Sequence, residues 1–123
     1  MKIQFARLSI EYWKLLRSFE RALELVAVDK QPGLIAQRRY SSNRLEAILK
    51  ECDMQIIAFD GMAFEVNIPA AAVNGDEFSP EETLFVERTI EPAVVSQMSV
   101  IVLGRVFLSR QPPRQGEQNV PRD

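Results

Sequence analysis

Residues 5–26 read FARLSIEYWKLLRSFERALELV, and their apolar positions form the most regular pattern in the chain. These positions recur at alternating steps of three and four residues, a spacing that aligns one apolar stripe along an α-helix. The stripe consists of Phe5, Leu8, Tyr12, Leu15, Phe19, Ala22 and Val26. A second apolar row lies beside it, so the apolar face is wide enough to contact more than one neighbour. We predict a long amphipathic helix over the first 28 residues.

Two interpretations of this helix remain open. In the first, it covers a sheet of its own domain. In the second, which we favour because the repeat is 3.5 residues, it pairs with another copy of itself in a coiled-coil bundle. The second interpretation predicts a homodimer with an interface built from Phe5, Leu8, Tyr12, Leu15, Phe19, Leu45 and Ile48.

A second, shorter helix is expected to fold back against the first. The first helix should end near Asp29, because residues 29–33 contain Pro32 and Gly33, which favour a turn. Helical spacing resumes over 34–51. Two serines interrupt it, and Asn43 followed by Glu46 has the form of a capping box, so the helix could restart at Asn43. Either way, the sequence predicts a helical hairpin.

From residue 54 the pattern becomes extended. We predict a strand over 54–59, a tight turn at Asp60-Gly61 and a returning strand over 62–66. A long surface loop, with one short turn at its three alanines, is expected over 67–80. Further strands are predicted over 84–90, with Leu84, Val86 and Ile90 on one side, at Val94-Val95, and over 98–108 with a bulge or bend at Gly104.

The predicted fold class is α+β, with an N-terminal helical hairpin that forms a dimeric bundle and a small antiparallel β-domain after it. Residues 1–52 are the helical dimerisation segment and residues 53–109 the β-domain. Residues 110–123 are rich in proline and polar residues, and we expect a disordered tail.

The composition excludes several kinds of chemistry. The chain has no histidine, so Ser-His and Cys-His nucleophile pairs cannot form. Cys52 is the only cysteine, and we expect it to be a small buried side chain. The acidic residues near 76–82 lack the spacing of a calcium loop and are expected to be solvated. We therefore predict no catalytic residues, no metal site and no cofactor.

The charge balance also narrows the class of partner. A formal net charge of −2 gives no overall basic field, so we expect no nucleic-acid partner. The apolar runs are shorter than a membrane span needs, and charged residues come too early for a signal peptide. A cytoplasmic protein without membrane contact is expected.

Several strings resemble the GrpE family, the nucleotide exchange factors of Hsp70 chaperones. Residues 15–25, LLRSFERALEL, resemble the end of that family's long helix, and 45–50, LEAILK, its bundle helix. Residues 60–64, DGMAF, are similar to its Glu-Gly-x-x-Phe, and 100–108, VIVLGRVFL, to its closing strand. The resemblance implies a non-enzymatic homodimer that promotes ADP release from an Hsp70-type chaperone. It further implies chaperone contacts at Phe64, Glu65, Val102, Gly104 and Arg105.

The departures from the family lie in the part that faces the chaperone. Val102, Leu103 and Gly104 stand where the family has Arg-Pro-Ala, and Val66 replaces the proline of its Phe-Asp-Pro. An alternative therefore stays open: a dimeric adaptor or structural protein that keeps a GrpE-like fold without exchange activity. A third hypothesis is an enzyme whose site is built from carboxylates.

Overall fold

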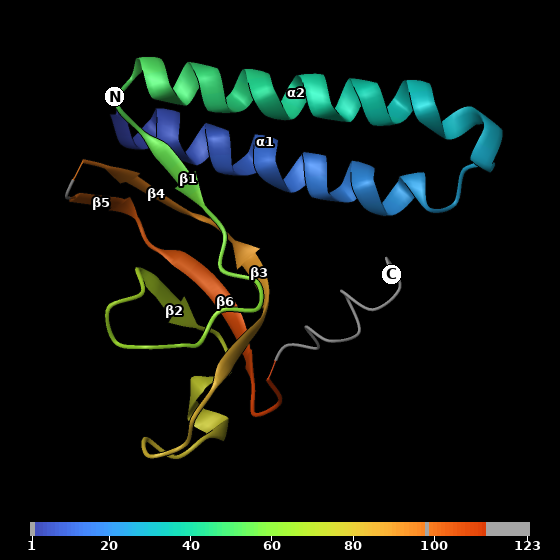
Figure 1. The fold of residues 1–123 in the computed structure, drawn as a ribbon. Coiled ribbons are helices and arrows are strands. Elements are labelled where there is room, and N and C mark those ends of the chain that lie inside the picture. The colour runs from blue at the N-terminus through green and yellow to red at the C-terminus, as the bar shows by residue number, and fades with distance from the viewer. Residues whose placement is uncertain (1, 98, 113–123) are drawn as a thin grey trace.

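The computed structural model describes residues 2–97 and 99–112. Two long helices come first and short strands come after them, so the predicted α+β class is confirmed (Figure 1). The elements are α1 (Lys2–Leu23), the 3-10 turn η1 (Val28–Lys30), α2 (Gln31–Glu51), β1 (Gln55–Ile57), β2 (Ala70–Ala72), the 3-10 turn η2 (Gly75–Glu77), β3 (Phe85–Glu91), β4 (Ala93–Ser96), β5 (Ser99–Val102) and β6 (Gly104–Ser109).

The predicted helical hairpin is present, but α1 is shorter than expected. It ends at Leu23 rather than near Asp29. The side-chain amide of Gln31 donates to the carbonyl oxygens of Leu23 at 3.0 Å and Val26 at 2.8 Å. Leu23 O also accepts the backbone N–H of Val26 at 3.1 Å, so the Gln31 amide adds a second donor at the last residue of α1 and one donor to the connection after it. The first residue of α2 therefore closes the connection between the helices.

The second helix is longer and more continuous than predicted. It begins at Gln31 because Pro32 lies in its first turn, where the missing N–H removes no helical hydrogen bond. It then runs unbroken through residues 41–43, so a restart at Asn43 is wrong. Leu45 and Leu49 on this helix are buried, and such packing outweighs the weak helix propensity of the serines and asparagine.

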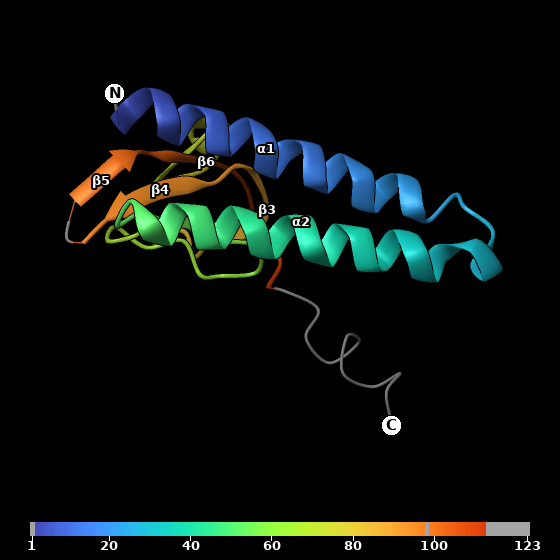
Figure 2. The ribbon, with the colours of Figure 1, turned by 90° about the horizontal axis from the view of Figure 1, so that it is seen from above.

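The strands form two three-stranded sheets, which we call the upper sheet (β1-β4-β5) and the lower sheet (β2-β6-β3). The upper sheet is antiparallel, and the helices lie over it (Figures 1 and 2). The lower sheet is mixed, since β2 runs parallel to β6 while β3 is antiparallel to it. A purely antiparallel β-domain is therefore wrong, and the three alanines predicted as a turn form strand β2.

The predicted hairpin over 54–66 is also wrong. β1 pairs with β4, not with the segment after Asp60-Gly61. Instead, the chain turns at Gly61 and lies along the start of β3, where Gly61 N–H donates to Val86 O at 2.8 Å and Phe64 N–H to Leu84 O at 2.9 Å. The turn is present as predicted, but the chain after it pairs with β3, which comes about twenty residues later in the sequence.

β3 does not keep the simple alternation that its sequence suggests. Its pairing with β6 shifts register between Val86 and Arg88 and again between Thr89 and Glu91. These irregularities bury Val86 and Thr89, three residues apart, while Leu84 and Ile90 are half-buried. The predicted shared face therefore holds for Leu84 and Val86, which pack in the same hydrophobic cluster, but not for Ile90. An extra residue in a strand changes which face the residues after it occupy, and Ile90 follows the first register shift.

A sharp bend at Gly104 carries the chain from one sheet to the other. β5 belongs to the upper sheet and β6 to the lower, with only Leu103 between them. A Cβ added at Gly104 would lie 2.9 Å from the ring of Phe59 and 3.1 Å from the backbone nitrogen of Ala93. The predicted bend at Gly104 is confirmed, and the close approach of two other segments explains the glycine.

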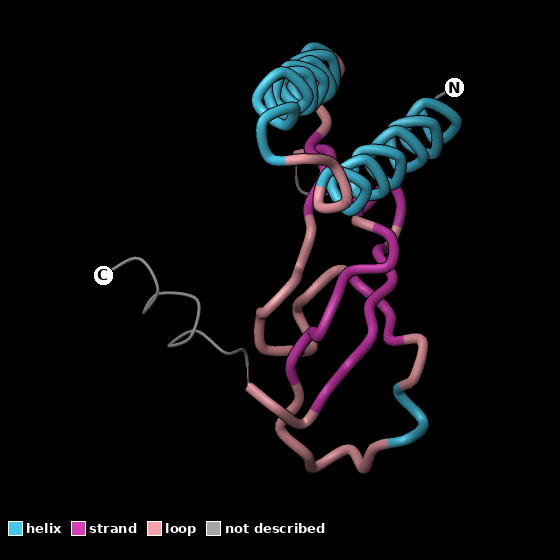
Figure 3. Tube along the Cα trace, turned by 90° about the vertical axis from the view of Figure 1, so that its right-hand side faces the viewer, coloured by secondary structure: helices cyan, strands magenta, loops and turns pink. Residues whose placement is uncertain are grey.

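Two hydrophobic cores hold the molecule together. The upper core joins the helical hairpin to the upper sheet and contains Ala6, Ile10, Leu45, Leu49, Met54 and Val94. The lower core lies within the β-strands and contains Phe59, Val86, Ala93, Val106 and Leu108. Figure 3 shows both helices on one side of the strands. Of the predicted tail, only residues 110–112 fall within the described part of the chain.

Candidate functional site

The predicted dimer stripe divides into residues that pack inside the chain and residues that face solvent. Leu45 is buried, and Phe5 and Tyr12 pack against the upper core. The Tyr12 hydroxyl donates to the carbonyl oxygen of Ser41 at 2.8 Å, which ties α1 to α2. Phe19 and Ile48 are half-buried. These five residues therefore already have neighbours within their own chain.

Leu8 and Leu15 lie on the exposed side of α1. Their side chains are 66% and 71% exposed, and their seven-residue spacing places them on the same face of the helix. Ile3, on the same helix, is 39% exposed. We call Leu8 and Leu15 the outer α1 stripe. It is the part of the predicted interface that remains available to a partner.

The connection between the helices exposes further apolar side chains that the sequence analysis did not single out. Leu25 is 89% exposed and Val28 is 80% exposed, and Tyr40 on α2 is also exposed. This end of the hairpin extends beyond the sheets (Figures 1 and 2). Both Leu25 and Val28 lie inside the predicted helix over the first 28 residues, whereas in the structure they follow the end of α1 at Leu23.

The five residues assigned to the chaperone contact do not form one surface patch. Phe64 packs against the lower core and Val102 against the upper core. Gly104 is buried at the bend between the sheets. Glu65 and Arg105 are exposed. Only these two place a charged side chain where a partner could reach it.

Arg105 belongs to a chain of charges that links the lower sheet to α1. Its guanidinium lies 3.7 Å from a carboxylate oxygen of Glu91, and the other oxygen of Glu91 accepts a hydrogen bond from Lys14 at 3.0 Å. The hydrogen bond from Lys14 to Glu91 raises the pKa of the Lys14 ammonium above its usual value, against a smaller opposing effect of burial. The ion pair with Glu91 therefore orients the Arg105 side chain, of which 53% stays exposed.

A second charged contact holds α1 to the turn after β1. The Arg17 guanidinium meets both carboxylate oxygens of Asp60 at 3.4 Å. Burial acts to raise the pKa of Asp60, but the Thr89 hydroxyl and the Arg17 guanidinium together outweigh it and hold that pKa below its usual value. The Thr89 oxygen also accepts the backbone N–H of buried Phe59 at 2.8 Å.

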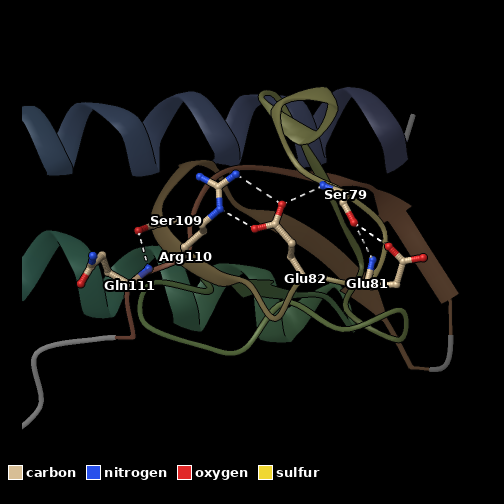
Figure 4. Close-up of polar contacts among 6 residues, drawn as sticks. All are labelled: Ser79, Glu81, Glu82, Ser109, Arg110 and Gln111. Carbon is tan, nitrogen blue, oxygen red and sulfur yellow. Dashed lines mark hydrogen bonds and ion pairs between the residues drawn. The ribbon is translucent and has the colours of Figure 1, made fainter.

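Two acidic residues of the loop after η2, Glu81 and Glu82, make contacts within the chain (Figure 4). Glu82 accepts hydrogen bonds from Arg110 and from the backbone N–H of Ser79, and Glu81 accepts one from the Ser79 hydroxyl. The hydrogen bond from Arg110 lowers the pKa of Glu82. The Arg110 guanidinium also stacks on Phe78 at 4.7 Å, so Arg110, which was assigned to the tail, is anchored to this loop.

The structure also bears on a metal site, on the cysteine and on a membrane-spanning helix. Within residues 2–97 and 99–112, no group of three or more acidic or cysteine side chains is arranged to hold a metal ion. Cys52 is exposed at the end of α2, so the prediction of a buried cysteine is wrong. In the part of the chain that the structure describes, no helix has the length and apolar character that crossing a membrane requires.

Comparisons of the chain with protein-family models, with curated proteins and with solved structures gave no match. The residues and their geometry are therefore the basis for assigning a function.

Proposed function

We propose that the protein is a GrpE-like nucleotide exchange factor, a cytoplasmic homodimer that promotes ADP release from an Hsp70-type chaperone. The observation that carries the proposal is the arrangement of a helical hairpin, with an exposed apolar stripe, above a small β-domain that presents Arg105. This is the order of elements that the resemblance of residues 15–25 and 60–64 to that family implies.

The dimer part of the proposal rests on the outer α1 stripe. Leu8 and Leu15 have neighbours on the same helix that pack inward, so the apolar face of α1 extends beyond what the upper core covers. Apolar side chains in such a row are stabilised when a second apolar surface removes them from water. A second copy of the hairpin supplies that surface and produces a bundle of four helices.

The proposed mechanism is a linkage between two binding events. If the β-domain binds the open, nucleotide-free form of the chaperone ATPase domain more tightly than the closed form, it must weaken nucleotide binding by the same factor. No covalent step and no cofactor is required. Arg105 and Glu65 supply the charged contacts, since both are exposed.

The test is the release of a fluorescent ADP analogue from a purified Hsp70-type chaperone. The wild-type chain should accelerate release, and Arg105→Ala should reduce the acceleration by roughly ten- to a hundredfold. A charge-assisted hydrogen bond contributes about 1.5–3 kcal/mol, and about 1.4 kcal/mol corresponds to a factor of ten.

The matched control is Arg39→Ala, which removes an exposed arginine from α2. It should leave the acceleration unchanged, and circular dichroism should show both variants folded. Failure of the wild-type chain to accelerate release, together with no binding at tens of micromolar, would contradict the proposal.

One observation favours the adaptor as a second candidate. Gly104 is buried and Phe64 and Val102 are partly buried against the two cores, so the surface offered to a chaperone is smaller than the resemblance implies. An adaptor would keep the dimer but show neither chaperone binding nor accelerated ADP release.

A further inference from the structure

A basic cleft lies between α1 and β3, and neither the dimer nor the proposed chaperone contact uses it. Its volume is about 350 Å³. Four cationic side chains line it together with an aromatic ring and two hydroxyl groups: Lys14, Arg17, Arg21, Arg88, Trp13, Ser18 and Thr89. The residues come from two segments that are distant in the sequence, so the cluster could not be seen before the fold was known.

The carboxylates around the cleft balance only part of this charge. Glu91 and Glu11 contact Lys14, and Asp60 contacts Arg17. Within residues 2–97 and 99–112, no carboxylate oxygen lies within 4.0 Å of the guanidinium nitrogens of Arg21 or Arg88. Glu91 is also shared with Arg105. The cleft therefore has more positive than negative groups.

Two of the guanidinium groups are held in place by aromatic rings. Arg17 lies over the ring of Trp13 at 4.3 Å, and Arg88 over the ring of Phe107 at 4.7 Å. A guanidinium that lies over an aromatic ring keeps its N–H groups available to donate to a ligand. Arg21 is held by a hydrogen bond to the Ser18 hydroxyl at 3.1 Å. These arginines are thus partly ordered before any ligand arrives.

The existing ion pair of Arg17 is a loose one. Both of its contacts with Asp60 measure 3.4 Å, whereas charge-assisted N–H···O bonds are usually about 2.7–2.9 Å long. The Arg17 guanidinium can therefore accept a further oxyanion without first breaking a short contact. Together with Arg21 and Arg88 it offers several N–H donors to one ligand.

We propose that this cleft binds a compact polyanion, a small molecule with two or more phosphate or carboxylate groups that contact Arg21 and Arg88. The volume is at the lower end of the range for small-molecule sites, which is about 300–1,000 Å³. Trp13 and Ile90 give the cleft an apolar wall beside its cations. The ligand contacts are assigned to Arg21 and Arg88, whereas the chaperone proposal rests on Arg105 and Glu65, so either proposal can fail alone.

Trp13 is the only tryptophan in the chain and lines the cleft, so its fluorescence reports on binding directly. Pyrophosphate and citrate are titrated separately, with sodium chloride at equal ionic strength as the reference. We expect a saturable fluorescence change with at least one of the two anions. Saturation with pyrophosphate alone identifies phosphate groups as the ligand chemistry, and saturation with citrate alone identifies carboxylates.

The decisive variants are Arg88→Gln and Arg21→Gln, each of which removes one cation without removing the aromatic reporter. Each should weaken binding of the anion by roughly tenfold, because a charge-assisted contact is lost. Arg39→Gln, on the exposed surface of α2, should leave the affinity unchanged. A response no greater than that of sodium chloride, or equal affinity in all three variants, would overturn the proposal.

Discussion

Asn74 is a buried polar residue whose side-chain amide takes the place of a neighbouring strand. Its nitrogen donates to the carbonyl oxygen of Leu108 at 3.1 Å, and its oxygen accepts the N–H of Leu108 at 2.9 Å. β2 ends at Ala72, so these two bonds continue the pairing of β6 beyond the end of β2. The side chain of Asn74 thus substitutes for a backbone segment.

Replacing Asn74 by alanine should lower the free energy of unfolding by about 2–4 kcal/mol. Two hydrogen bonds are lost and the buried backbone groups of Leu108 are left without partners, which adds a desolvation cost. Urea denaturation measures the change. Asn67→Ala, at an exposed asparagine, is the control and should change stability by less than about 0.5 kcal/mol. Equal losses in both variants would show that the paired amide contributes nothing.

At the residue scale, the sequence predicted where the backbone bends better than it predicted which side chains are buried. The bend at Gly104 was predicted because glycine inside a strand pattern often marks one. The division between Tyr12, which packs inward, and Leu8, which faces solvent, was not predicted. Periodicity identifies which side chains share a helix face, but not which part of that face its own sheet will cover. The basic cleft was missed because its two halves are distant in sequence.

At the scale of elements, Arg17 and Asp60 form a charged contact between α1 and the turn after β1. The pKa of Asp60 is lowered in the folded chain, so the stability that this carboxylate contributes is present above its unfolded pKa of about 3.9. That contribution is lost as the pH falls below about 4 through the lowered folded pKa. Asp60→Asn should therefore be less stable than the wild type near neutral pH, and the difference should shrink in acid.

The measurement is the free energy of unfolding of both proteins by urea denaturation between about pH 7 and pH 2.5. Arg17→Gln is the matched second variant, because it removes one cause of the lowered pKa and should move the acid loss to higher pH. Parallel curves for the wild type and Asp60→Asn over the whole range would contradict the assigned role of Asp60.

The elements that the sequence predicted are those with strong local signals. Both helices have long apolar patterns, and the strands near 84–90 and 98–108 are rich in β-branched residues. β2 was missed because Ala70–Ala72 has little strand propensity and forms only by pairing with β6. The Asp60-Gly61 turn was recognised, but its pairing partner was wrong, because turn chemistry does not specify a distant strand.

At the scale of the whole molecule, the helices and the strands are not independent layers. The upper core joins both helices to β1, β4 and β5, and the lower core joins the strands to each other. The hairpin therefore holds a fixed position over the β-domain. A partner that binds the outer α1 stripe consequently sets the position of the β-domain as well, and a second copy would place two β-domains in a defined relation.

The central claim, that the hairpin pairs with a second copy, is tested most directly by sedimentation of the chain at about 10 µM. The account predicts a species of twice the 14.0 kDa chain mass. A Leu8→Glu, Leu15→Glu variant should sediment as a folded monomer, because both side chains are exposed in the single chain but would bury unpaired charges in the dimer. Val66→Glu, an exposed change in the β-domain, should remain a dimer. A single wild-type species of 14.0 kDa at this concentration would contradict the account.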